Sequence, residues 1–106
     1  MVKRGEVWMV NLDPTVGSEI QKTRPCVVIS PTEMHDFLRT AIIAPMTTGS
    51  YPAPFRIPVR HGGKQGLILL DQIRAVDKAR LVKRAGVIAP AMLKATLDAL
   101  GEVFAE

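Results

Sequence analysis

The chain has 106 residues, of which 47% are apolar and 23% charged. This length suits one domain with a single modest core, expected to span residues 1–106, and the composition excludes a disordered chain. No apolar run approaches the roughly 18 residues of a membrane-spanning helix. The early polar residues Gly5 and Glu6 argue against a signal peptide. The lone Cys26 excludes an internal disulfide, and no second thiol or histidine cluster offers a zinc site. We therefore expect no metal, no cofactor, no membrane contact and a reducing, cytoplasmic setting.

The net charge of +4 is unevenly distributed. Residues 56–84 contain eight basic side chains against two acidic ones, whereas residues 90–106 contain one lysine and three acids. A basic region beside an acidic end is typical of a protein that meets a polyanion with one face. An ordinary solvated surface is the alternative, and charge alone leaves both interpretations open.

Short strand patterns dominate the first half of the chain. Large and β-branched side chains predict a strand over residues 7–12, and apolar runs predict strands over residues 26–29 and 40–44. Pro45 is expected to end the third of these strands. The segment 47–54 is expected to be a loop without regular structure.

A short helical turn is expected between the second and third strands. Ser30 has the hydroxyl of a helix cap, Pro31 suits the first helical position, and Glu33 can reach back to the cap. This spacing predicts a capped turn over residues 32–38.

The second half continues with strands. We expect strands over residues 55–59, 66–76 and 86–89, with a glycine turn over residues 61–64 and a basic connector over residues 78–84. The strand over residues 66–76 is the longest, although a polar pair interrupts its apolar run.

After Pro90 the apolar period becomes helical. One helix face is expected to pack on the core and is formed by Leu93, Leu97, Leu100 and Phe104. Many short strands followed by one helix predict a mainly β fold, a small curled sheet or barrel with the helix packed against it.

Arg24 is the first candidate for chemistry. Pro25 disfavours helix for Arg24 and fixes its own φ, so the arginine is expected in extended backbone at the entrance of a buried strand. A guanidinium keeps its charge and makes paired hydrogen bonds, which suits a phosphate or a carboxylate. A structural salt bridge between Glu19 and Arg24 is the alternative.

These residue types can cut RNA without a metal ion, because RNA carries its own nucleophile, the 2′-hydroxyl. Arg24 can stabilise charge on the phosphate, and Thr47 can donate a hydrogen bond to a phosphate oxygen. Glu19 can accept the 2′-hydroxyl proton or orient Arg24, which is itself a doubtful proton donor.

Each candidate also has a plainer interpretation. Thr47 and Thr48 can be loop-capping hydroxyls, and Asp71 and Gln72 a satisfied polar pair that joins sheet to loop. A lone histidine such as His61, in a glycine turn, is more often a surface residue than a catalytic one.

Five sequence blocks resemble the MazF/PemK family of toxin endoribonucleases, in that family's order and at family-like intervals. They are RGEVWMVNLDP at residues 4–14, GSE at 17–19, RPCVVIS at 24–30, APMTT at 44–48 and GLILLDQIRAVD at 66–77. The resemblance covers nearly the whole chain. It implies a small SH3-like barrel of the PemK/CcdB kind, with a short helical turn and a C-terminal helix.

The resemblance also implies an activity. Such toxins of type II toxin–antitoxin systems are homodimers that cut single-stranded RNA, including mRNA, at short motifs without a metal ion. They leave a 2′,3′-cyclic phosphate and a 5′-hydroxyl, and so arrest translation and growth. A cognate antitoxin with an acidic, disordered tail is expected to cover the RNA site.

The family's site residues can be carried over to this chain. Its catalytic arginine and threonine correspond to Arg24 and Thr47, and its loop glutamate to Glu19. Further RNA contacts are expected from Ser18, Gln21, Lys22, Thr48, Ser50, Asp71 and Gln72.

The chain departs from the family's pattern at two positions, and two other functions are alternatives to the ribonuclease. Ser18 and Leu69 stand where one branch has a histidine and a second arginine, which favours the version that uses Arg24 and Thr47. A poison of a DNA topoisomerase (gyrase) with the same fold and a catalytically silent RNA-binding module are the alternatives. The topoisomerase-poisoning relative lacks the arginine–threonine pair and ends in tryptophan-glycine-isoleucine. This chain has the pair and ends in FAE, and both features favour the nuclease.

Overall fold

A computed structural model describes the whole chain, residues 1–106. The strands are β1 (Glu6–Asn11), β2 (Thr23–Val28), β3 (Thr40–Thr47), β4 (Arg56–His61), β5 (Lys64–Leu69), β6 (Arg74–Asp77) and β7 (Leu81–Val87). Three short 3₁₀ turns, η1 (Thr32–Asp36), η2 (Leu70–Gln72) and η3 (Lys78–Arg80), and one helix, α1 (Pro90–Val103), complete the elements. No helix is long and apolar enough to span a bilayer.

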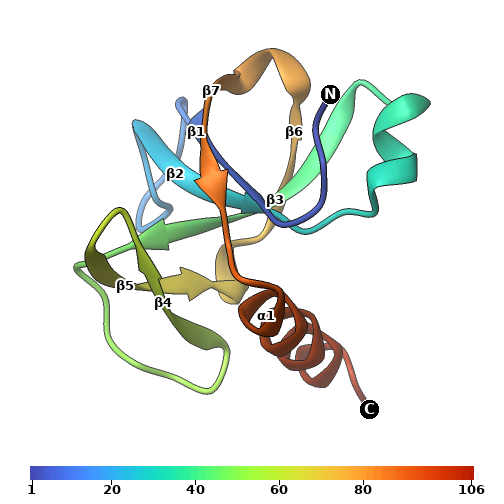
Figure 1. Cartoon of the computed structure of the whole chain (residues 1–106). Helices are drawn as coiled ribbons and strands as arrows, with labels where there is room; N and C mark the ends of the chain where they lie inside the picture. The colour runs from blue at the N-terminus through green and yellow to red at the C-terminus, as the bar shows by residue number, and fades with distance from the viewer.

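The strands form one curled antiparallel sheet in the order β4-β5-β3-β2-β1-β7, with β6 paired to β3 (Figure 1). Strand β3 is central because it pairs with β2 along one side, and with β6 and then β5 along the other. Helix α1 follows β7 and lies beneath the curled sheet, in contact with β4. The predicted mainly β, barrel-like fold with a C-terminal helix is confirmed.

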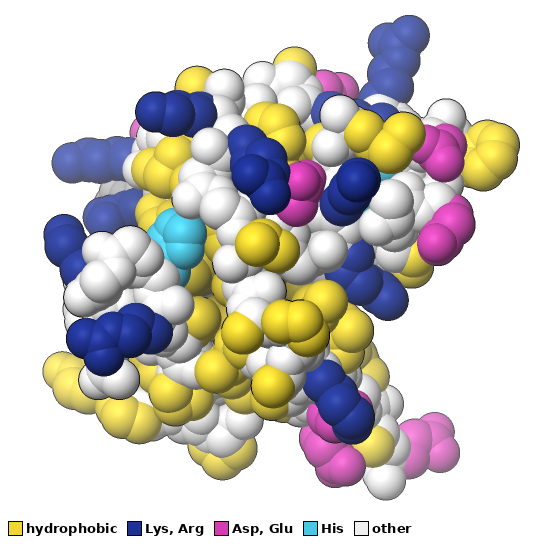
Figure 2. Space-filling view, in the orientation of Figure 1, with side chains coloured by type: hydrophobic (Ala, Val, Ile, Leu, Met, Phe, Trp, Pro, Cys, Tyr) yellow, Lys and Arg dark blue, Asp and Glu magenta, His cyan; other side chains and the backbone are white.

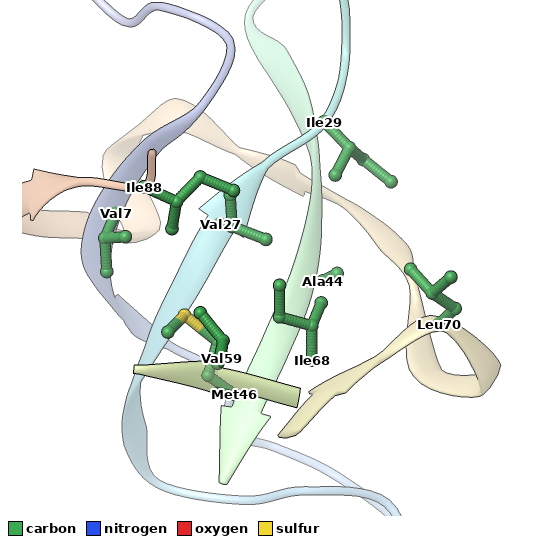
Figure 3. Packing of buried hydrophobic residues seen from close by; sticks show 9 residues of the cluster. All are labelled: Val7, Val27, Ile29, Ala44, Met46, Val59, Ile68, Leu70 and Ile88. Atoms are coloured by element: carbon green, nitrogen blue, oxygen red, sulfur yellow. The ribbon is translucent and has the colours of Figure 1, made fainter. Parts of the chain in front are cut away.

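Two apolar clusters form the core. The first, inside the curl of the sheet, consists of Val7, Val27, Ile29, Ala44, Met46, Val59, Ile68, Leu70 and Ile88 (Figure 3). The second consists of Val10, Leu12, Cys26, Val28, Ile43, Val76 and Leu81. Cys26 is buried as predicted, and desolvation raises the pKa of its thiol to about 12, so this sulfur stays protonated.

Strand β3 continues through Pro45, so the predicted end at residue 44 is wrong. Pro45 pairs with Cys26 of β2. On the other side, pairing with β6 ends at Ile43 and pairing with β5 begins at Met46. The proline therefore lies where β3 changes partners, a position at which a strand tolerates a missing N–H.

The prediction of one long strand over residues 66–76 is also wrong. It divides into β5, η2 and β6, and its polar pair, Asp71 and Gln72, lies in the 3₁₀ turn η2. The basic connector contains η3 and most of β7, so the last strand begins at Leu81 and not at residue 86. The predicted loop over residues 47–54 has no regular element after Thr47.

The predicted capping of the turn after β2 is wrong in its detail. The turn is the 3₁₀ segment η1, and it has no side-chain cap. Ser30 Oγ instead accepts a hydrogen bond from Ile42 N (3.0 Å) and shares a second hydrogen bond with Nε2 of the buried His35 (2.6 Å). The hydroxyl thus joins η1 to β3.

Helix α1 begins at Pro90 as predicted, and half of the predicted stripe is confirmed, because Leu93 and Leu100 pack on the core while Leu97 and Phe104 do not. The residues against the core are Met92, Leu93, Thr96, Ala99 and Leu100. The buried Thr96 fits an apolar face because its hydroxyl donates to the Met92 carbonyl (2.8 Å). Leu97 lies outside both clusters, and Phe104 is 71% exposed.

Candidate functional site

An open groove of about 380 Å³ lies where β2, β3 and the β4–β5 hairpin meet. It is lined by Arg24, Pro25, Met46, Thr47, Thr48, Val59, His61, Gly62, Lys64 and Gly66. The groove thus contains two of the three residues that were predicted to be catalytic, Arg24 and Thr47, but not the third, Glu19.

Strand pairing brings Arg24 and Thr47 together. The pairing of β2 with β3 ends at Cys26 and Pro45, and Arg24 and Thr47 each lie two residues beyond this pair at the same end of the two strands. Arg24 is the second residue of β2 and lies ahead of its buried part, which begins at Cys26, so its predicted place at the entrance of a buried strand is confirmed. Its Nε donates to the Gln21 carbonyl (3.3 Å), while both terminal nitrogens of the exposed guanidinium have no partner in the chain. Thr47 Oγ1 accepts from Gly49 N (3.3 Å), which leaves the hydroxyl proton to donate elsewhere.

Gly66 fixes how closely β5 approaches Thr47. A Cβ at residue 66 would lie 2.7 Å from the Thr47 carbonyl oxygen, closer than such atoms can approach. Only glycine therefore allows β5 to lie against β3 at this point.

The β4–β5 hairpin brings His61 and Lys64 to the groove. These residues pair across Gly62 and Gly63, whose φ angles of +59° and +77° are those of a two-residue turn with both residues left-handed. The predicted turn is confirmed, but the sequence favoured a surface position over a catalytic role for His61. The place of His61 in the groove could not be predicted, because it depends on the pairing of β5 with β3, which brings the hairpin close to Thr47.

A second cavity, of about 180 Å³, contains the other predicted carboxylates. It is lined by Leu12, Glu19, Ile20, Pro45, Asp71, Gln72, Ile73 and Arg74. Glu19 does not line the larger groove, and it makes no salt bridge with Arg24, so the structural alternative for this pair is wrong. Glu19 Oε1 instead accepts from Val16 N (2.7 Å). Gln72 Oε1 accepts from Ile20 N (2.7 Å) and ties η2 to the β1–β2 loop.

Arg56 connects two further residues that were predicted to contact RNA. Its guanidinium donates to both carboxylate oxygens of Asp71 (3.2 and 3.0 Å) and to Ser50 Oγ. The hydrogen bond and charge of Asp71 raise the pKa of Arg56 above its usual value. The β3–β4 loop is thereby tied to η2, and nothing local in the sequence distinguished Arg56 from other basic residues.

The remaining predicted RNA contacts lie on the β1–β2 loop, outside the lining of both cavities. Ser18, Gln21 and Lys22 are exposed there. Lys22 N donates to Asp13 Oδ1 (2.9 Å), and Leu12 N donates to the Lys22 carbonyl (3.0 Å), which closes the base of the loop. The polar tip of the loop is thus presented to solvent from a fixed base.

The charged side chains that line the larger groove, Arg24 and Lys64, are both basic. Figure 2 shows further Lys and Arg side chains along the side of the molecule where β2 and β5 lie, and acidic ones near the C-terminal end of α1. A groove with this charge suits an anionic ligand.

A model of the PemK-like, MazF-like toxins of type II toxin–antitoxin systems matches residues 3–104. The chain belongs to this family. This PemK/MazF-like toxin is 32% identical over 108 residues to endoribonuclease PemK of Escherichia coli, covering 96% of this chain and 81% of that protein. It is 38% identical over 90 residues to endoribonuclease EndoA of Bacillus subtilis (strain 168), covering 79% of this chain and 78% of that protein.

Solved structures share the fold of this PemK/MazF-like toxin. MazF from Deinococcus radiodurans matches with a TM-score of 0.85 at 23% identity, over 96% of this chain and 94% of that one. A mycobacterial endoribonuclease in complex with its cognate antitoxin matches with a TM-score of 0.81 at 18% identity, over 96% and 93% of the two chains. The resemblance noted in the five sequence blocks is therefore confirmed.

Proposed function

We propose that this chain is a toxin that cuts single-stranded RNA at a short sequence motif without a metal ion, leaving a 2′,3′-cyclic phosphate and a 5′-hydroxyl. Its family and its curated relatives support the coarser activity, that of a toxin–antitoxin endoribonuclease of the PemK/MazF type. The single observation that carries the finer proposal is that Arg24 and Thr47 share one open groove whose charged lining is basic.

In the proposed reaction the 2′-hydroxyl of the substrate attacks the adjacent phosphorus. Arg24 binds the phosphate through its unpartnered terminal nitrogens and stabilises the charge that develops on it, and Thr47 donates its hydroxyl to a phosphate oxygen. Thr48 contacts the RNA inside the groove. Glu19, Asp71 and Gln72 act at the second cavity, and Ser18, Gln21, Lys22 and Ser50 contact the RNA from the two flanking loops.

The proposal includes two protein partners. An acidic, disordered antitoxin tail would bind the groove through the cations that bind RNA, since both ligands are polyanions. A second copy of the chain would form a homodimer, and the exposed apolar side chains Val82 (64%) and Val87 (60%) on the edge strand β7 support such a contact. Light scattering of the purified toxin measures this state directly.

The test is incubation of the purified protein with a long single-stranded RNA in excess chelator, followed by mapping of the cut ends. We expect discrete cuts with cyclic-phosphate ends from the wild type, and none from a folded Arg24→Ala variant. Arg39→Ala is the matched control, because Arg39 is exposed beside the opposite end of β3 and should leave cutting unchanged. Intact RNA after incubation with the folded wild type would contradict the proposal and favour a silent RNA binder or a protein-binding poison.

A further inference from the structure

We propose that His61 accepts the proton of the attacking 2′-hydroxyl and is therefore a catalytic residue of the groove. This inference rests on the proposed ribonuclease function. It assigns the one role that Arg24 and Thr47 cannot fill, because a guanidinium has no proton acceptor and a hydroxyl does not hold an additional proton near neutral pH.

The reaction requires two proton transfers. A bond forms between the 2′-oxygen and phosphorus while the bond between phosphorus and the 5′-oxygen breaks. The 2′-hydroxyl proton passes to the neutral imidazole, and the departing 5′-oxygen takes a proton from water. The imidazolium then returns its proton to the hydroxide left behind, so the ring is restored and no further reactant is consumed.

His61 is the only side chain lining the groove that can take up this proton. Arg24 and Lys64 carry donors without acceptors, and Thr47 and Thr48 carry hydroxyls. The other lining residues are proline, methionine, valine and glycine. Imidazole, by contrast, binds and releases protons near neutral pH.

The carboxylates that could compete for this role are engaged elsewhere. Glu19 lies at the second cavity and accepts a hydrogen bond from the backbone of its own loop. Asp71 lies at the same cavity, and both of its oxygens accept from Arg56. Neither carboxylate lines the groove that contains Arg24 and Thr47.

The imidazole of His61 is held in place without having its nitrogens occupied. A Cβ on Gly86 would lie 3.2 Å from Cε1 of the ring, so the ring rests against the backbone of β7 at a glycine whose φ is +142°. The pairing of His61 with Lys64 fixes the backbone from which the ring projects. Neither ring nitrogen has a hydrogen-bond partner within the chain, and the half-buried side chain borders the groove. Such a group is positioned in advance for proton transfer.

The test is the pH dependence of cleavage of a short RNA with one cut site, in chelator. The charged groups that line the groove with His61 are Arg24 of β2 and Lys64 of β5, and Gly86 of β7 adds none. In the wild type, kcat should fall as the pH is lowered, because a protonated ring cannot accept a proton. His61→Gln should lower kcat about 100-fold or more, change KM little and remove this acidic limb.

Two further variants separate chemistry from packing. His61→Phe keeps a ring against Gly86 and should lose as much activity as His61→Gln. His61→Gly removes the ring, and added imidazole should restore part of its cleavage. An uncleavable RNA with a 2′-deoxy sugar at the cut site should bind to His61→Gln, His61→Phe and His61→Gly with near wild-type affinity. Such binding would show that the three variants are folded.

Three outcomes would overturn the inference. They are wild-type kcat in His61→Phe, no response of His61→Gly to imidazole, and an acidic limb that is lost in Glu19→Gln but kept in His61→Gln. The failure of the wild type to cut RNA is a separate result, since it would contradict the proposed ribonuclease and not the particular role of His61.

Discussion

At the scale of single residues, Gly66 makes the position of Thr47 sensitive to one methyl group. Gly66→Ala would place a carbon 2.7 Å from the Thr47 carbonyl oxygen, so β3 or β5 must move. We expect cleavage to fall about 10-fold or more and the free energy of unfolding to drop by about 1–3 kcal/mol. Cleavage assays and urea denaturation measure the two effects.

The matched control for this change is Gly101→Ala. Gly101 lies in α1, a Cβ added there would meet open space, and alanine is favoured over glycine in a helix by about 1 kcal/mol. This variant should be slightly more stable than the wild type and cut RNA equally well. Wild-type cleavage by Gly66→Ala would show that the close approach of β5 does not position Thr47.

Glu6 should make the free energy of unfolding depend on pH. Its carboxylate accepts hydrogen bonds from Lys3 N (2.7 Å), Trp8 Nε1 (3.2 Å) and Arg84 Nε (2.7 Å). Burial raises the pKa of Glu6, but these hydrogen bonds and the charge of Arg84 together outweigh burial, and the pKa is lowered. A lowered pKa in the folded state stabilises the fold above the unfolded pKa, and the stabilisation is lost as the pH falls through the folded pKa.

Glu6→Gln should therefore cost about 1–3 kcal/mol of unfolding free energy near neutral pH. The difference from the wild type should shrink as the pH falls below the ordinary pKa of glutamate and through the lowered pKa of Glu6 in the folded state. Urea denaturation of both proteins at several pH values measures this difference in unfolding free energy. An equal difference at all pH values would mean that the charge of Glu6 does not contribute.

At the candidate site, the sequence could predict only those features that depend on immediate neighbours in the chain. Arg24 could be predicted because Pro25 and the apolar run after it constrain the backbone. His61 and Arg56 could not be, because each meets its partners only through strand pairing. His61 rests on Gly86 of β7, and Arg56 reaches Asp71 of η2.

At the scale of elements, α1 packs through a face that differs in part from the predicted stripe. Leu100 contacts the first core cluster, whereas Leu97 lies outside both clusters. Leu100→Ala should lower the free energy of unfolding by about 1–3 kcal/mol, which is less than the loss for a fully buried leucine, because Leu100 is only partly buried. Leu97→Ala should lower it by less than Leu100→Ala does. Thermal and urea denaturation compare them. A larger loss from Leu97→Ala would show that Leu97 is covered, by the core or by a second copy.

Most strands could be predicted approximately because side-chain size and alternation are local signals. Two of the errors fall where a strand changes its pairing partner or the chain leaves the strand: β3 passes Pro45 between β6 and β5, and the apolar run over residues 66–76 turns at η2. An apolar run has the same composition in a strand and in a buried 3₁₀ turn. Half of the helix face was misjudged because a threonine whose hydroxyl bonds its own helix can be buried.

At the scale of the whole molecule, the basic side of the protein should make RNA binding dependent on salt. Lys64→Gln should reduce the slope of log affinity against log salt by about 0.7, the value for one cation bound to a single strand. Lys94→Gln is the control, because Lys94 lies on α1 and already pairs with Asp98 (2.8 Å). Fluorescence anisotropy with the uncleavable RNA measures both slopes. An unchanged slope in Lys64→Gln would place the RNA backbone away from the hairpin.

The pairing of β1 with β7 sets when the sheet can be completed during synthesis. Glu6 pairs with Val87, so the sheet joins residues that lie 81 positions apart in the chain. Sheets built from such distant pairs fold in milliseconds to seconds, and only after both strands are available. The ring of His61 also rests on β7, so it lacks this support in a growing chain in which β7 has not yet been made. We therefore expect the toxin to leave the message that encodes it uncut until β7 has been synthesised and has paired with β1.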